Sequence, residues 1–159
     1  MSDDIWYNEN AGNFSSSDLF VRAVIDLYGS VDPYQSAYFG EKFLAKLNAE
    51  VIGVSLGQNP YLYRNFSSPF LVGPSTPPTL IIHGALDRIV YPIESQTLYN
   101  SLNEASNSSR IYLKYNLGSH GFDAFGFTPG GQLADYFIER FIWLNYFKSK
   151  SVELEQKLE

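Results

Sequence analysis

The chain has 159 residues, a formal net charge of −6, two histidines and no cysteine. This length fits one domain with a sizeable core, and the negative charge argues against nucleic acid or an anionic membrane as the main partner. The lack of cysteine excludes disulfides, thiolate metal sites and a cysteine nucleophile, and neither histidine belongs to an HExxH pattern, so we expect no metal and no cofactor.

The first half of the chain predicts one strand, one helix and a long loop. Polar, unpatterned residues dominate 1–18 and predict a flexible N-terminal segment. A largely apolar run over 20–28 predicts a buried strand, and apolar residues at helical spacing predict a helix over 36–48. Five prolines between residues 58 and 78 exclude a long helix or a central strand there, which leaves a loop with at most a helical turn at 61–64.

The second half alternates strands and helices more regularly. The continuous apolar run 79–83 is typical of a strand covered on both faces. A helix is expected over 92–105, followed by a strand with alternating polarity over 110–115. The pair Thr128-Pro129 is suited to cap and start a final helix.

This order of elements predicts an α/β fold, with a mainly parallel sheet between two helical layers. We expect the domain to span 19–147 and a charged, frayed tail to occupy 148–159. Ligand sites in parallel sheets lie beyond the carboxyl ends of the strands. Asp87 follows the second predicted strand and His120 follows the third, so both side chains are expected at the same edge of the sheet.

Asp87 and His120 together predict acid–base chemistry. A carboxylate that accepts a hydrogen bond from one imidazole nitrogen fixes the tautomer and leaves the other nitrogen free to act as a general base. Gly118 and Gly121 flank the histidine and permit an unusual loop backbone. Two alternatives stay open at this point: Asp87 caps a helix or pairs with Arg88, and His120 is an ordinary loop histidine.

His83 is expected to have a different role from His120. It lies inside the apolar strand 79–83, where a histidine is more often a hydrogen-bonded core residue than a catalytic group. We therefore interpret His83 as structural.

Four segments carry a resemblance to a known family: Val24-Ile-Asp-Leu-Tyr-Gly29 with Asp32, Asn65-Phe-Ser-Ser-Pro69, Pro77-Pro-Thr-Leu-Ile-Ile-His-Gly84 with Asp87, Val90 and Pro92, and Ser119-His-Gly-Phe122. They resemble the C-terminal half of the α/β hydrolases, in particular the esterase and prolyl-oligopeptidase-like members. The resemblance covers about residues 20–147 and implies a partial α/β-hydrolase fold, with about the last three strands and their helices. It also implies that Asp87 and His120 are the acid and the base of a Ser-His-Asp triad.

The nucleophile of such a triad is not evident in the sequence. The family carries it in a G-x-S-x-G elbow between a strand and a helix, and the literal match is Gly53-Val-Ser55-Leu-Gly57. We interpret this match as false, because Pro60 and later prolines forbid the helix that an elbow needs. The 23 residues between Ser55 and Thr79 also leave no room for another strand and crossover. The family's oxyanion loop is likewise expected to be missing.

With this resemblance, the sequence therefore predicts the C-terminal part of a serine hydrolase. Its expected substrate is a small carboxylic ester, with an amide or peptide as the alternative. The chain alone is expected to be inactive or weakly active. One alternative is a non-catalytic assembly module. It would pair through the open sheet edge at 20–28, in a homo-oligomer or with a complementing chain. The other is a complete small hydrolase that uses Ser55. No apolar run is long enough to span a membrane and the acidic start lacks signal-peptide features, so a cytoplasmic location is expected.

Overall fold

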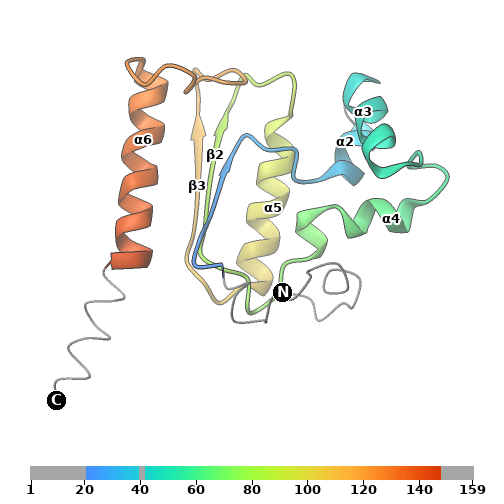
Figure 1. Ribbon diagram of the computed structural model, residues 1–159, viewed down its shortest axis with the longest axis horizontal. Helices are drawn as coiled ribbons and strands as arrows, with labels where there is room; N and C mark the ends of the chain where they lie inside the picture. Colours follow the sequence, from blue (N-terminus) through green and yellow to red (C-terminus); the bar gives the residue numbers. More distant parts are fainter. Residues whose placement is uncertain (1–20, 40–41, 148–159) are drawn as a thin grey trace, which may run out of the picture.

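The computed structural model describes residues 21–39 and 42–147 (Figure 1). The predicted N-terminal segment 1–18 and tail 148–159 lie outside the described residues. Within the described part, no helix is both long and apolar enough to cross a membrane.

The sheet contains three parallel strands in the order β1 (Val24–Leu27), β2 (Thr79–Gly84) and β3 (Arg110–Tyr115). In the central strand, Ile81 pairs with Asp26 on one side and with Tyr112 on the other. All six residues of β2 are buried, as its continuous apolar sequence predicts for a strand with neighbours on both edges and helices on both faces. The strands predicted at 79–83 and 110–115 are confirmed, and β1 is shorter than the strand predicted at 20–28.

One long helix covers each face of the sheet, which gives three layers (Figure 1). Helix α5 (Pro92–Ala105) and helix α6 (Pro129–Ile142) both begin where the sequence predicts, each with proline in its first turn. Thr128 caps α6 by accepting the N–H of Gly131 at 3.1 Å.

Two separate cores lie on the two sides of the sheet because successive side chains of β2 point to opposite faces. The core on the α5 side contains Ile81, Leu98 and Leu102, and the core on the α6 side contains Leu80, Ile82, Ala134 and Phe141.

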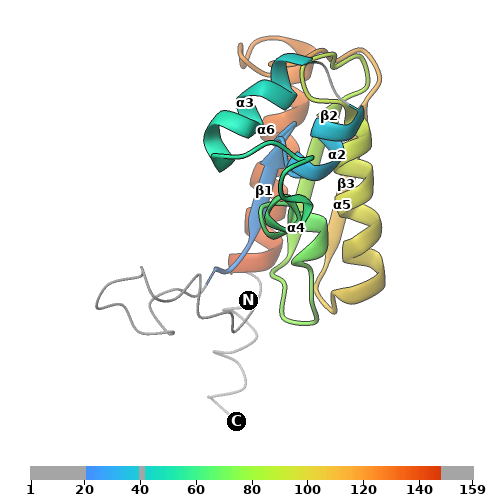
Figure 2. The same ribbon diagram turned by 90° about the vertical axis from the view of Figure 1, so that its right-hand side faces the viewer.

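The connection from β1 to β2 contains α2 (Pro33–Phe39), α3 (Lys42–Ile52), α4 (Pro60–Asn65) and the 3₁₀ turn η1 (Ser68–Phe70). These elements lie on the α5 side of the sheet (Figures 1 and 2). The single helix predicted over 36–48 is wrong, because two helices occupy this region. Asp32 starts the first of them early by accepting the N–H of Gln35 at 3.0 Å, and Pro33 follows as the first helical residue. The helical turn predicted at 61–64 is confirmed within α4.

Candidate acid–base site

The loops that follow β2 and β3 meet at the carboxyl edge of the sheet. The N–H of Ala85 donates to the carbonyl of Tyr115, and the N–H of Leu86 donates to the carbonyl of Gly118, both at 2.8 Å. A Cβ on Gly84 would overlap the carbonyl group of Gly118, so this approach of two backbones requires glycine. The two loops are thus joined by their main chains before any side chain contributes.

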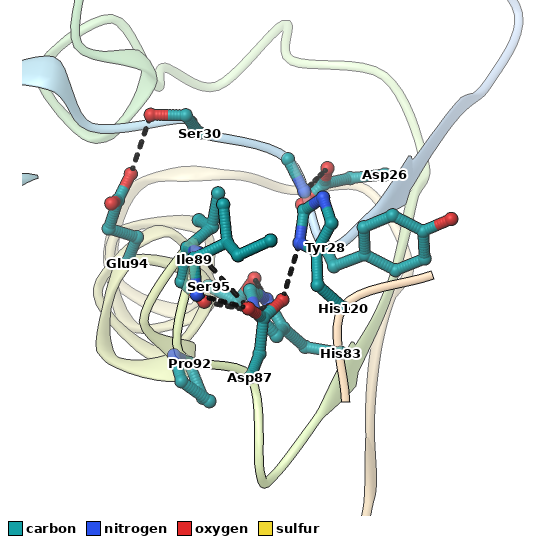
Figure 3. A network of polar contacts seen from close by, with 12 residues as sticks. Asp26, Tyr28, Ser30, His83, Asp87, Ile89, Pro92, Glu94, Ser95 and His120 are labelled. Carbon is teal, nitrogen blue, oxygen red and sulfur yellow. Dashed lines mark hydrogen bonds and ion pairs between the residues drawn. The ribbon is translucent and has the colours of Figure 1, made fainter. Parts of the chain in front are cut away.

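Asp87 is held by three N–H donors. Its Oδ1 accepts the backbone N–H groups of Ile89 at 2.8 Å and Val90 at 3.0 Å, and its Oδ2 accepts from Nδ1 of His120 at 2.8 Å (Figure 3). The residue is only 3% exposed. Hydrogen bonds of this kind fix the orientation of a buried carboxylate. Asp87 therefore closes a local turn and contacts the imidazole at the same time. It does not cap a helix, because α5 begins only at Pro92.

His120 is the exposed member of the pair, with 32% of its side chain accessible to solvent. A carboxylate only accepts hydrogen bonds, so Nδ1 carries the proton in the contact with Asp87. In the neutral ring, Nε2 is then the unprotonated nitrogen and can accept a proton. Gly121, next to it, has a φ of 71°, which fits the unusual loop backbone predicted there.

His83 is fully buried and hydrogen-bonded on both ring nitrogens, as expected of a core histidine. Its Nε2 lies 3.0 Å from the carbonyl oxygen of Val90, which only accepts, so Nε2 carries the proton. Its Nδ1 then accepts the hydroxyl proton of Ser95 at 2.7 Å. The same Nε2 lies 3.3 Å from Oδ2 of Asp87, a contact that the sequence analysis missed. The spacing of four residues between His83 and Asp87 is too weak a signal to predict it.

Tyr28 and Asp123 also belong to the surroundings of His120 and were not predicted. The Tyr28 ring lies 4.7 Å from the His120 ring between centroids, and its hydroxyl donates to Oδ1 of Asp123 at 2.7 Å. Burial and this bond to Asp123 raise the pKa of Tyr28 to about 12, so the hydroxyl stays protonated near neutral pH. No sequence signal links residues so far apart in the chain.

A second buried carboxylate, Glu94, lies in the first turn of α5. Its Oε2 accepts the backbone N–H of Asp32 at 3.0 Å and the hydroxyl of Ser30 at 3.3 Å, whereas its Oε1 has no partner within residues 21–39 and 42–147. Burial, followed by repulsion from nearby carboxylates, raises the pKa of Glu94 to about 7. Burial also raises the pKa of Asp26, whose Oδ2 is likewise buried without a hydrogen-bond partner in the described part of the chain.

Ser55 lies on an exposed turn after α3, and residues 51–52 just before it are the end of that helix. Its hydroxyl donates to Oε1 of Gln58 at 2.8 Å, and its backbone N–H donates to the same oxygen. The serine follows a helix rather than the end of a strand, and the short helix α4 begins only at Pro60, so the turn lacks the geometry of a nucleophile elbow.

A cavity of about 720 Å³ is lined by Gln35, Ala85, Tyr91, Pro92, Ile93, Gln96 and Lys114, and contains neither Asp87 nor His120. The hydrogen-bond geometry, rather than this cavity, therefore identifies the candidate site. Among residues 21–39 and 42–147, no cluster of His, Asp and Glu side chains is arranged to hold a metal ion.

Sequence comparisons match the chain to esterases. A family model described as BD-FAE matches residues 4–102, a range that includes Asp87 and ends before His120. The chain is 30% identical over 108 residues to esterase LipC from Mycobacterium tuberculosis (strain ATCC 25618 / H37Rv). This match covers 67% of the chain and 27% of that protein, so the chain spans about a quarter of the length of that relative.

Solved structures with the same fold are also longer than this chain. A truncated form of a carbohydrate esterase from gut microbiota has a TM-score of 0.62 and 27% identity, over 76% of this chain and 43% of its own. The thermophilic esterase Est2 from Thermogutta terrifontis has a TM-score of 0.65 and 16% identity, over 86% and 47%. An acylaminoacyl peptidase from Pyrococcus horikoshii has a TM-score of 0.59 and 24% identity, over 79% and 20%. The last two likenesses concern the fold alone.

Proposed function

Because the chain belongs to the BD-FAE family, we propose that it supplies the acid, Asp87, and the base, His120, of a Ser-His-Asp triad that hydrolyses carboxylic esters. The predicted resemblance to esterase and prolyl-oligopeptidase-like α/β hydrolases is confirmed by the family match and by the relatives. The predicted partial α/β-hydrolase fold is confirmed as well. The observation that carries the proposal is the 2.8 Å hydrogen bond between Nδ1 of His120 and Oδ2 of Asp87.

The chemistry follows from the protonation of His120. Nε2 takes the hydroxyl proton of a serine as the serine oxygen attacks the ester carbonyl, and Asp87 stabilises the imidazolium that results. The imidazolium then returns the proton to the departing alkoxide, which leaves an acyl-serine. His120 next takes a proton from the water that attacks the acyl-serine and returns it to the departing serine oxygen, which releases the carboxylic acid and restores both the serine hydroxyl and the neutral imidazole.

The serine and the oxyanion donors are proposed to come from outside the described residues. Ser55 is bonded to Gln58 on an exposed turn that is not an elbow. The relatives are also two to five times longer than the part of them that this chain matches, since that part is 20–47% of their length. Each oxyanion donor stabilises the transition state by about 3–4 kcal/mol. Without these donors and the serine, the chain by itself is expected to be inactive or weakly active.

The names of the relatives favour an ester as the substrate class, and we propose an ester of a small acid. LipC and the gut carbohydrate esterase, at 30% and 27% identity, are both esterases by name. An amide or peptide stays the alternative substrate that we propose for this chain. It is favoured by the name of the acylaminoacyl peptidase of Pyrococcus horikoshii, which shares the fold at 24% identity.

Complementation tests the proposal. The full chain is mixed with the part of LipC that it does not match, and hydrolysis of p-nitrophenyl acetate is measured. We expect turnover only in the mixture, and a loss of roughly 10³- to 10⁴-fold with Asp87→Asn or His120→Gln. Turnover that survives His120→Gln, or a mixed complex that forms in sedimentation and stays inactive, would contradict the proposal.

A serine-directed phosphonate separates this function from a complete small hydrolase. No labelling of Ser55 is expected in the full chain, and labelling of Ser55 that disappears with His120→Ala would assign the nucleophile to this chain instead. The exposed Ser119, next to the histidine, provides a matched serine for the mass-spectrometric readout.

A second candidate function is assembly through the edge of β1. Within the described residues, β1 pairs with β2 on one side and with no strand on the other. An apolar groove of about 400 Å³ adjoins this edge and is lined in part by Val24, Val31, Leu71 and Val72. An open, partly apolar edge favours pairing with another chain. Sedimentation at micromolar concentration is expected to show a dimer or larger species, and a stable monomer would count against this candidate.

A further inference from the structure

Tyr28 adopts a backbone conformation that its residue type disfavours. It directly follows β1, and its N–H donates to the carbonyl of Ile82 at 2.8 Å, so it is still anchored to the sheet. Its φ is 43°, and no other non-glycine residue in the described ranges has a positive φ. A side chain with a Cβ is strained in this left-handed region, and such strain persists where the surroundings hold it in place. The contacts of Tyr28 should therefore explain its conformation.

The ring of Tyr28 packs against the histidine loop. Figure 3 shows the Tyr28 ring beside the imidazole of His120; the two ring centroids lie 4.7 Å apart, with 64° between the ring planes. The centroid of Tyr28 also lies 5.6 Å from that of Phe122, with 68° between the planes. Phe122 in turn packs against the core on the α6 side. The ring of Tyr28 therefore connects the exposed imidazole to the packed interior. An edge-to-face pair of this kind shifts an equilibrium by roughly 2- to 12-fold.

The hydroxyl of Tyr28 binds the same loop at a second point. It donates to Oδ1 of Asp123 at 2.7 Å, three residues beyond His120. The raised pKa of Tyr28, about 12, keeps this donor protonated near neutral pH. Ring and hydroxyl thus hold the histidine loop on either side of Gly121.

We propose that Tyr28 is a positioning residue for His120: its ring keeps the imidazole turned toward Asp87, and its hydroxyl fixes the loop through Asp123. The imidazole is about one-third exposed and has, among the residues described, one hydrogen bond to a side chain, that to Asp87. Without the Tyr28 ring, the imidazole gains a competing orientation that turns Nδ1 to solvent. The catalytic meaning of this role rests on the proposed function, whereas the effect on the imidazole does not.

Nuclear magnetic resonance of the full chain can test this inference without any turnover. Two-bond ¹H–¹⁵N spectra report which imidazole nitrogen carries the proton, and the chain has only two histidines to assign. In the wild type we expect the Nδ1–H tautomer for His120 and the Nε2–H tautomer for His83, because their acceptors face opposite nitrogens. An Nε2–H tautomer for His120 in the wild type would overturn both this inference and the proposed acid–base pair.

Tyr28→Asn tests the ring, because asparagine tolerates the left-handed backbone and brings no aromatic group. We expect the ratio of the Nδ1–H tautomer of His120 to its Nε2–H tautomer to fall by about 2- to 10-fold. Tyr136→Asn is the matched control: Tyr136 is an exposed tyrosine with an edge-to-face partner in α6, and its loss should leave His120 unchanged. An unchanged His120 in Tyr28→Asn overturns the positioning role and leaves the acid–base pair intact.

Tyr28→Phe and Asp123→Ala test the hydroxyl and retain the ring. Each should shift the tautomer ratio by about 2- to 3-fold, and the double variant should shift it no further than either alone, because both remove one bond. In the complemented enzyme, Tyr28→Asn should lower kcat roughly 10- to 100-fold with KM within about 3-fold. An increase in KM alone would assign Tyr28 to substrate binding and overturn the inference.

Discussion

Asp87 and Glu94 are both buried carboxylates near the same edge of the sheet, at 3% and 1% exposure, yet their surroundings differ. Asp87 accepts three N–H groups and uses both of its oxygens. Glu94 accepts one N–H and one hydroxyl on a single oxygen, and its other oxygen has no partner among the residues that the structure describes. The two buried carboxyl groups therefore differ in their hydrogen-bond donors rather than in their depth. The partners of Asp87 fix both of its oxygens and orient it toward His120, whereas burial raises the pKa of Glu94 to about 7.

The largest expected contrast concerns catalysis. In the complemented enzyme, Asp87→Asn should lower kcat by roughly 10⁴-fold, because the amide can donate to Nδ1 and so favour the wrong tautomer of His120. Glu94→Gln should change kcat by less than about 3-fold, since Glu94 contacts Ser30 and Asp32 and not the imidazole. Steady-state kinetics on p-nitrophenyl acetate measures both variants. Comparable losses in the two would contradict the division of roles.

A second contrast separates the two histidines that contact Asp87. His83→Ala should lower the free energy of unfolding by about 2–4 kcal/mol, because it leaves Ser95 and the Val90 carbonyl unpaired beside a void. His120→Ala should cost less than about 1 kcal/mol, because its side chain is already partly in water. Urea titration of the full chain gives both values, and equal losses would refute the assignment of His83 to the core.

The third contrast is a pH dependence that comes from Glu94. Its pKa is about 7 in the folded chain against an ordinary 4.5, so between these values the folded state holds a proton that the unfolded state has released. Stability should therefore fall as pH rises through this window, by about 1–3 kcal/mol, and the effect of Glu94 should be constant above and below it. Glu94→Gln should flatten the slope, in part only, because the pKa of Asp26 is raised too. A slope unchanged in Glu94→Gln would assign the dependence to other groups.

The smallest expected effect is that of Ser55→Ala. The serine lies on an exposed turn outside both carboxylate networks, and its hydroxyl contacts only Gln58 among the residues described. Its loss should change stability by less than about 0.5 kcal/mol and leave turnover of the complemented enzyme unaltered. A complete loss of turnover would restore Ser55 as the nucleophile.

Local patterns predicted much of the fold. The apolar run of β2, the prolines that open α5 and α6 and the alternation in β3 are signals carried by neighbouring residues, and each element was placed within a few residues. The single helix predicted at 36–48 was wrong, because apolar spacing alone does not reveal the break between α2 and α3. Asp32-Pro33 was the start signal that this reading overlooked.

The site was predictable only where the topology of the sheet determined it. Two loops after adjacent parallel strands must share an edge, which was enough to bring Asp87 and His120 together. Tyr28 could not be found this way, because its contact with His120 depends on a left-handed backbone rather than on strand direction. The burial of Glu94 was also not predicted. A glutamate in the first turn of a helix is usually explained by its favourable interaction with the helix dipole, which does not require burial.

The main-chain contact between Gly84 and Gly118 has a consequence for how this chain can vary. Any side chain at position 84 would push against the Gly118 carbonyl and so separate the two loops. Exposed residues of the acid loop, such as Arg88 and Ile89, carry no such restriction. In a library randomised at residues 84, 88 and 89, folded members should therefore retain glycine at position 84 and accept almost any residue at 88 and 89. The distance between the loops of Asp87 and His120 would then stay constant while the exposed surface of the Asp87 loop varies.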